Sequence, residues 1–247
     1  DINVAAWFDA SDANSYTISS GTNIGTLSDK AGNFTMSDYG TPQRAYNALN
    51  MMPAFYWNGN EDYTSDNYGP VADNGNHWSI GLVRWENVNN NRDSFWSFDA
   101  SDQAKRDPSD INNTRTYALS AGYPYNRWYG EIDYDGANTI SAGNAKNSFN
   151  ETGIGQQIGR YTFAMVAIVF NKSQNEIYGR INGTIRTPVH PYSNNIAPLS
   201  QLRLMRNRGS VRLQGYIAEY FHVADLPGTG GTDISDLQKA EGYLAHK

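Results

Sequence analysis

The segment that decides the fold class is RYTFAMVAIVFNKSQNEIYGRINGTIRTP, residues 160–188. Its apolar run over residues 161–170 has the length of one buried strand, and the polar segment NKSQN that follows is a turn. A second strand continues through Ile181 and ends at Asn182 and Gly183, a dipeptide that favours a two-residue hairpin turn because both residues tolerate positive φ. The segment therefore predicts two consecutive β-hairpins.

Similar runs separated by turn residues occur along most of the chain, which predicts an all-β fold. A further hairpin is expected between residues 202–205 and 211–223, with residues 207–209 in its turn. No Pro- or Ser-rich linker divides the chain, so residues 1–247 are interpreted as a single domain.

The end of the chain is different. TDISDLQKAEGYLAHK, residues 232–247, contains Ser235 and Gln238 at the spacing of a capping box. One short C-terminal helix is predicted, because three residues recur there at helical spacing: Leu237, Glu241 and Leu244.

The composition excludes several classes of function. The chain has 247 residues, no cysteine and a net charge of -6, with its 19 lysines and arginines scattered. Without cysteine it has neither a disulfide framework nor a thiolate metal site, and without a basic patch a nucleic-acid partner is not expected. No apolar run has the length of a membrane span, so membrane insertion is not expected either. The charged fraction of 18% with abundant Tyr, Trp, Asn and Gly is typical of proteins outside the cell or on a virion surface.

Four segments carry a resemblance to a known family: residues 5–33, 53–63, 163–184 and 215–247. In order and spacing they resemble bacterial and phage laminin-G-like domains of the concanavalin A-like lectin and glucanase superfamily. The resemblance implies a jelly-roll β-sandwich of two antiparallel sheets, with the first and last strands adjacent and the short helix packed on the sandwich. The superfamily contains sugar-binding modules, adhesion domains, glycosidases and structural display domains, so function has to be argued from the site.

The segment YGEIDYDG, residues 129–136, raises the question of catalysis. It is similar to the catalytic strand of laminarinase-type glucanases. By that resemblance, Glu131 of this chain would be the nucleophile and Asp133 would orient it. The second Glu of that pattern is missing, since Asp135 stands before a predicted turn, and a retaining mechanism needs two carboxyl groups about 5–5.5 Å apart. An ordinary strand with a polar face is therefore favoured, and its carboxylates could bind sugar hydroxyls or a hard cation.

Aromatic and polar residues gather just before this strand, in SAGYPYNRWYGE, residues 120–131. Sugars stack their apolar faces on flat rings and pair their hydroxyls with amide, carboxylate and guanidinium groups. Further candidates near such a ligand face are Arg84, Trp85 and Trp96. The predicted ligand-binding residues are Tyr123, Tyr125, Asn126, Arg127, Tyr129, Glu131 and Asp133.

The sequence predicts a non-catalytic domain for carbohydrate or cell-surface recognition, in a phage virion or a secreted bacterial protein. Its expected partner is a glycan or cell-surface polysaccharide. One alternative is a structural fibre or capsid-decoration domain that contacts other virion chains, and another is a glycosidase that uses Glu131. No cofactor is expected, although a structural calcium ion stays open at three acidic sites: Asp9 and Asp12, Glu61 and Asp62, and Asp99 and Asp102.

Overall fold

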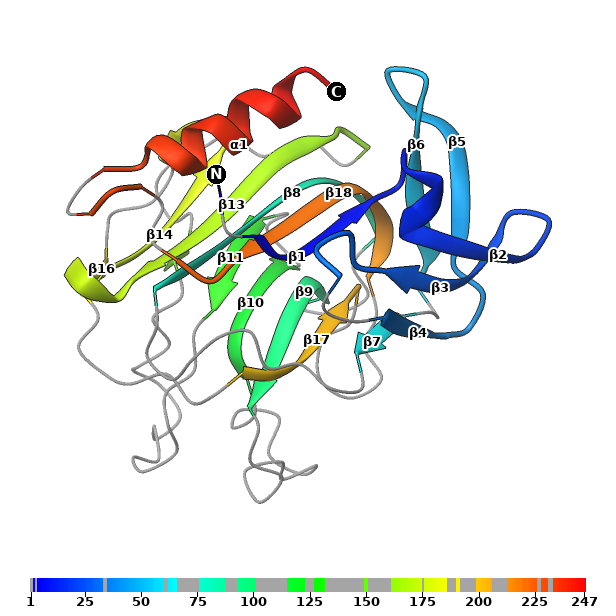
Figure 1. Cartoon of the computed structure of the whole chain (residues 1–247), viewed down its shortest axis with the longest axis horizontal. Coiled ribbons are helices and arrows are strands. Elements are labelled where there is room, and N and C mark those ends of the chain that lie inside the picture. The colour runs from blue at the N-terminus through cyan, green and yellow to red at the C-terminus, as the bar shows by residue number, and fades with distance from the viewer. Residues whose placement is uncertain are drawn as a thin grey trace.

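The structure is a computed structural model, and it describes residues 2, 4–32, 35–59, 62–65, 76–87, 93–100, 115–122, 127–131, 149–150, 161–174, 176–185, 190–191, 199–205, 213–225, 228–230 and 233–247. It is a sandwich of two antiparallel sheets with one helix, α1 (Ser235–Ala245), on its outside (Figure 1). The all-β class and the C-terminal helix predicted from the sequence are confirmed.

The sheet that carries α1 is called the helix-side sheet. Its spatial order is β5–β6–β18–β8–β13–β14, with β1 sharing one edge of β18 with β6, and β15 and β16 both pairing with β14. These strands are β1 (Val4–Asp9), β5 (Gln43–Leu49), β6 (Met52–Asn58), β8 (His77–Asn87), β13 (Ala164–Asn171), β14 (Glu176–Ile181), β15 (Thr184–Ile185), β16 (His190–Pro191) and β18 (Gln214–Val223).

The second sheet has the order β2–β3–β4–β7–β17–β9–β10–β11–β12. It meets the helix-side sheet at one edge, where Asn23 pairs with Gln43. Its strands are β2 (Tyr16–Ser20), β3 (Asn23–Ser28), β4 (Thr35–Tyr39), β7 (Asp62–Ser65), β9 (Asp93–Ala100), β10 (Arg115–Gly122), β11 (Arg127–Glu131), β12 (Phe149–Asn150) and β17 (Leu199–Leu204).

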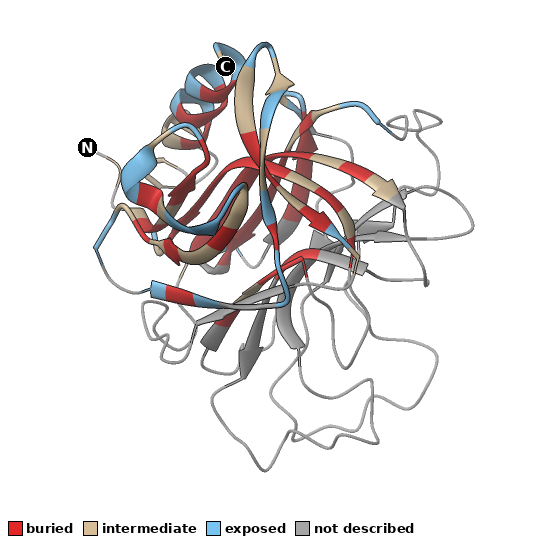
Figure 2. Ribbon diagram, turned by 90° about the vertical axis from the view of Figure 1, so that its right-hand side faces the viewer, coloured by how far each residue is buried: buried red, intermediate tan, exposed pale blue. Residues whose placement is uncertain are grey.

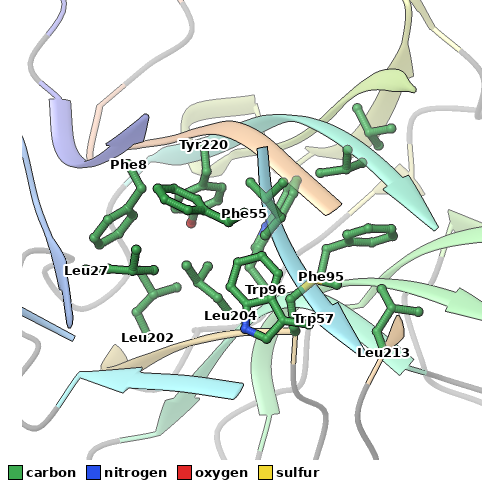
Figure 3. Close-up of a cluster of buried hydrophobic side chains, with 14 of the residues drawn as sticks. Phe8, Leu27, Phe55, Trp57, Phe95, Trp96, Leu202, Leu204, Leu213 and Tyr220 are labelled. Carbon is green, nitrogen blue, oxygen red and sulfur yellow. The ribbon is translucent and has the colours of Figure 1, made fainter. Parts of the chain in front are cut away.

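The main core lies between the two sheets. Figure 3 shows large rings and leucines from both sheets meeting there, among them Phe8, Trp57, Trp96 and Leu204, and all of them are fully buried. Figure 2 shows that the buried residues lie in the middle of the strands and the exposed ones nearer the hairpin tips. Removing this much apolar surface from water is the main stabilising contribution that such a sandwich has.

A second core lies on the other face of the helix-side sheet, beneath α1, and includes Leu237 and Leu244 of the helix. The helix-side sheet is therefore buried on both faces in this region. Its strand β13 alternates between the two cores, with Ile168 in the first and Ala167 and Val169 in the second. This explains why the sequence reads as a continuous apolar run rather than an alternating one.

Several predictions on this part of the chain are confirmed. Strands β13 and β14 form a hairpin, and β14 and β15 form the next one through Asn182 and Gly183, which both have positive φ. The first and last strands are neighbours, since β1 pairs with β18.

Two local predictions are wrong. Residues 202–205 and 211–223 do not form a hairpin: β17 pairs with β7 and β9 in the second sheet, whereas β18 lies in the helix-side sheet. The capping box is also absent, because the hydroxyl of Ser235 donates to Asp233 and the N-cap residue is Ile234. The carboxylate of Asp233 accepts hydrogen bonds from the backbone N–H groups of Thr229 and Ser235 instead, which fixes the entry to the helix.

Candidate functional site

The outer face of the helix-side sheet is only partly covered by α1. Ala54, Leu82 and Ala218 belong to the core beneath the helix. Side chains two positions apart on a strand share a face, so the next residues on this face, Tyr56 and Arg84, lie just beyond that core. Both are partly exposed, as is Tyr216 on β18.

Strand register aligns these residues across the sheet. Gln43 lies opposite Tyr56, Tyr56 opposite Tyr216, and Tyr216 opposite Arg84. Directly opposite residues of antiparallel strands point to the same face. Phe163, just before β13, extends the line, because the guanidinium carbon of Arg84 lies 5.5 Å from its ring centroid. We call these five residues the aromatic row.

The rings of the aromatic row are in contact. The ring centroids of Tyr56 and Tyr216 are 4.7 Å apart with a 37° angle between their planes, and those of Phe163 and Tyr216 are 6.1 Å apart. The guanidinium carbon of Arg84 lies 4.1 Å from the Tyr216 centroid. This close packing holds three flat, partly exposed rings and one guanidinium in a fixed arrangement.

Polar groups border the row on the side away from the helix. The Arg84 guanidinium pairs with the Glu86 carboxylate, and the Gln214 amide donates to the hydroxyl of Tyr56 at 3.1 Å. Burial, followed by the negative charge of Glu86, raises the pKa of Tyr216, whose hydroxyl is hydrogen-bonded to that carboxylate. At neutral pH the site therefore presents phenol hydroxyls, an amide and a paired guanidinium and carboxylate beside partly exposed rings, of which Tyr216 packs against Arg84 and Tyr56.

One residue next to the row has an unusual backbone. Tyr161 has a φ of 71°, a left-handed conformation that costs free energy for a residue with a side chain. Its N–H donates to the carbonyl of Trp85 at 3.1 Å, which ties it to β8, and its side chain is 62% exposed. A further aromatic ring is thus held at the surface where β13 begins.

The three further candidates named from the sequence, Arg84, Trp85 and Trp96, do not lie in one place. Arg84 belongs to the aromatic row. Trp85 and Trp96 do not lie near a ligand face, because both are buried in the core between the sheets, at 1% and 0% exposure. That prediction was wrong because a sequence does not show which face of a strand a tryptophan occupies.

The loop and strand predicted to bind the ligand are less fully described. Tyr123, Tyr125, Asn126 and Asp133 lie outside the described residues. Arg127, Tyr129 and Glu131 belong to β11, whose backbone pairs with β10 and β12, but their side chains are also outside the described part. The strand is confirmed over residues 127–131, and the binding roles of all seven residues stay predictions.

Asp9 and Asp12, one of the acidic pairs, contact lysine ammonium groups. Lys30 Nζ lies 2.9 Å from Asp12 and 3.4 Å from Asp9, and Lys247 Nζ lies 2.9 Å from Asp9. Burial alone would raise the pKa of Asp9, but hydrogen bonds from Lys247 and Ser11 bring it below its ordinary value. Asp9 thus joins β1 to Lys247, which follows α1, whereas Asp12 pairs with Lys30.

The other acidic positions give no test of the calcium alternative. Glu61 and Asp102 lie outside the described residues, as do the side chains of Asp62 and Asp99. Where side chains are described, no three His, Asp or Glu residues are grouped as metal ligands would be. Within the same part of the chain, no helix is long and apolar enough to cross a membrane.

Two histidines that are distant in the sequence lie together inside the sandwich. The ring centroids of His77 and His222 are 5.7 Å apart, and Ser79 Oγ lies 2.8 Å from His222 Nδ1. Burial, with the neighbouring His77, lowers the pKa of His222 well below its ordinary value. The pairing of β8 with β18 creates this cluster, so sequence spacing alone could not reveal it.

No family model and no curated protein matches the chain. Solved structures match its fold. Domain 4 of AbnA, a GH43 extracellular arabinanase from Geobacillus stearothermophilus, in complex with arabinotriose, is 14% identical with a TM-score of 0.64, covering 97% of this chain and 98% of that one.

Two further matches are to longer chains, of which this chain covers only part. The botulinum neurotoxin type G receptor binding domain is 12% identical with a TM-score of 0.60, and 98% of this chain covers 51% of it. A Trypanosoma rangeli sialidase is 9% identical with a TM-score of 0.60, and 98% of this chain covers 33% of it. At these identities the likeness shows the β-sandwich fold alone.

Proposed function

We propose that this chain is a non-catalytic glycan-recognition domain and that the aromatic row is its sugar-binding surface. The observation that carries the proposal is the contact pair Tyr56 and Tyr216, which is partly exposed on the part of the sheet face that α1 does not cover. Contiguous apolar surface that is exposed and bordered by polar residues marks an interaction site, whereas single exposed apolar residues need no such explanation.

The chemistry of the row suits a sugar. Each pyranose or furanose ring offers C–H groups that pack on an aromatic face, and hydroxyls that both donate and accept hydrogen bonds. The row supplies the rings, and Gln214, Glu86 and Arg84 supply donors and acceptors at its border. The ring contacts fix the side chains before a ligand arrives, which lowers the ordering cost of binding.

The comparisons support this proposal. The arabinanase domain, of which this chain covers 98%, was solved in complex with arabinotriose. The superfamily that the sequence resembles includes sugar-binding modules, so a glycan-recognition role is compatible with the resemblance. We further propose that residues 1–247 act as one domain, with an extracellular or virion-surface location in a phage or a secreted bacterial protein.

The experiment is a glycan array followed by titration calorimetry with the best ligand. Tyr216→Ala and Tyr56→Ala should each weaken binding by about tenfold or more, since truncating a central interface aromatic commonly costs over 1 kcal/mol. Tyr46→Ala is the matched control, because Tyr46 is 58% exposed and contacts Arg44 away from the row. Thermal unfolding of each variant checks that the fold persists.

The same experiment distinguishes the remaining alternatives. Loss of binding in Tyr125→Ala, with Tyr216→Ala unaffected, would move the site to the loop at residues 120–131. Release of reducing ends from a polysaccharide, abolished by Glu131→Gln, would establish the glycosidase. Absence of binding across the array, together with self-association in light scattering, would favour the fibre or capsid-decoration domain.

A further inference from the structure

We infer that the aromatic row binds a linear, uncharged oligosaccharide that lies across the strands and contacts several sugar units. This inference rests on the proposed function and specifies its ligand class. Two features of the row carry it: its length and its charge balance.

The row is longer than one sugar unit. It runs from Gln43 on β5 to Phe163 before β13 and crosses β6, β18 and β8. Neighbouring strands are about 4.8 Å apart, so four steps across the sheet give roughly 19 Å between the backbones at its two ends. The rings lie closer together, because the ring centroids of Tyr56 and Tyr216 are 4.7 Å apart and those of Tyr216 and Phe163 are 6.1 Å apart. A monosaccharide would cover one ring pair and leave the remainder of the row in water. An oligosaccharide perpendicular to the strands would cover all of it.

The ends of the row differ in exposure and chemistry. Gln43 is exposed and polar, and its position opposite Tyr56 places it on the same face as the rings. Phe163 closes the other end, where its partly exposed ring contacts Tyr216. A chain seated on Tyr56 and Tyr216 therefore meets a hydrogen-bonding side chain in one direction and an apolar ring in the other.

The charge balance favours an uncharged ligand. Arg84 is the cation of the row, but its guanidinium is already paired with Glu86, and Glu86 also accepts from Tyr216. A uronic or sialic acid carboxylate that approached Arg84 would meet Glu86 at close range, and like charges at an interface discriminate against a partner. Hydroxyls can accept from the guanidinium and donate to the carboxylate without that penalty.

The test measures affinity against chain length and charge. Arabino- and cello-oligosaccharides of one, three and six units, with galacturonic acid hexamer as the acidic probe, are titrated into the wild-type chain. We expect affinity for at least one neutral series to rise about tenfold or more from one unit to six, because each added contact ring contributes as an interface aromatic does. The acidic hexamer should bind more weakly than its neutral counterpart.

Four variants separate the parts of the inference. Gln43→Ala should reduce the affinity for the hexamer and leave the shortest binding probe unchanged, whereas Tyr216→Ala should weaken both. Glu86→Gln should raise the affinity for the galacturonic acid hexamer several-fold, because Arg84 is then unpaired. Phe163→Ala makes the same comparison at the apolar end of the row: it should reduce the affinity for the hexamer and leave that for the shortest binding probe unchanged. Thermal unfolding checks that this variant is folded.

The outcomes are distinguishable from failure of the proposed function. If no saccharide of any length or charge binds, the glycan-recognition function itself fails. If a monosaccharide binds as tightly as the hexamer, or if the acidic hexamer binds best, glycan recognition stands and this inference is overturned.

Discussion

Individual residues with positive φ show where the residue type suits the backbone conformation and where it does not. In the turn between β14 and β15, Asn182 and Gly183 have φ of 48° and 76°, and both residue types suit that conformation. The turn between β5 and β6 has the same character, with Asn50 at 45° and Met51 at 65°. A methionine there is costly, because its Cβ crowds the backbone in the left-handed region.

Replacing Met51 should therefore stabilise the protein. Met51 is 83% exposed, so Met51→Gly removes little packing, and we expect the free energy of unfolding to rise by about 1 kcal/mol. Urea denaturation measures the change. Gly183→Ala is the converse control, since a Cβ there meets no atom closer than 3.8 Å, and it should destabilise by a similar amount through its φ alone. Equal stability of Met51→Gly and wild type would contradict this account.

Among the elements, helix α1 is attached to the sheet by a buried ion pair as well as by leucines. Arg180 on β14 donates to both carboxylate oxygens of Glu241, at 2.6 and 2.9 Å, and both side chains are almost fully buried. Removing one partner leaves the other charge buried without compensation.

We expect Glu241→Ala to lower the free energy of unfolding by about 3 kcal/mol. The paired replacement Glu241→Leu with Arg180→Met should recover much of that loss, because no charge then stays unpaired in the interior. Asp236→Ala is the surface control: it breaks an exposed pair with Lys239 and should change stability by less than about 1 kcal/mol. Denaturant unfolding compares the four proteins, and equal losses for Asp236→Ala and Glu241→Ala would refute the argument.

The elements also show where sequence reasoning works and where it does not. The hairpins of β13, β14 and β15 were predictable because a strand-length apolar run and a turn dipeptide are local signals. The connection before β18 offered a similar turn signal, yet β17 and β18 lie in different sheets. A turn composition does not determine whether the chain returns along the same sheet or crosses to the other one.

For the whole molecule, the buried histidine cluster predicts how stability depends on pH. His222 has a folded-state pKa well below 6.5, because burial and then His77 disfavour its charged form. Below about pH 6.5 the unfolded chain binds a proton at this position that the folded chain does not, so folding is progressively disfavoured as pH falls towards the folded pKa. Glu219, whose pKa burial raises above 4.5, acts with the opposite sign between pH 4.5 and that raised pKa.

The melting temperature should therefore fall between pH 7.5 and 5.5 in a scan of the wild-type chain, at roughly constant ionic strength. His222→Gln should flatten the slope, and His246→Gln, which changes an exposed residue, should leave it unchanged. A flat profile for the wild type, or an unchanged slope in His222→Gln, would show that the cluster does not control acid stability.

The candidate site itself emerges only at the scale of the whole molecule. Tyr56, Arg84, Phe163 and Tyr216 come from segments that are far apart in the sequence. Of these four residues, only Arg84 was a candidate from the sequence. Register between β6, β18 and β8 brings them into one line, and the limited reach of α1 leaves that line open. Non-local pairing and helix placement are not readable from composition or spacing, whereas the sandwich class is.

The most direct test of the central claim is hydroxyl-radical footprinting of the wild-type chain, with and without the neutral oligosaccharide that binds best on the glycan array. Binding at the aromatic row should protect Tyr56, Tyr216 and Phe163, with no change at the exposed rings of Tyr46 and Tyr243. Protection confined to residues 120–133, with the aromatic row unaffected, would contradict it.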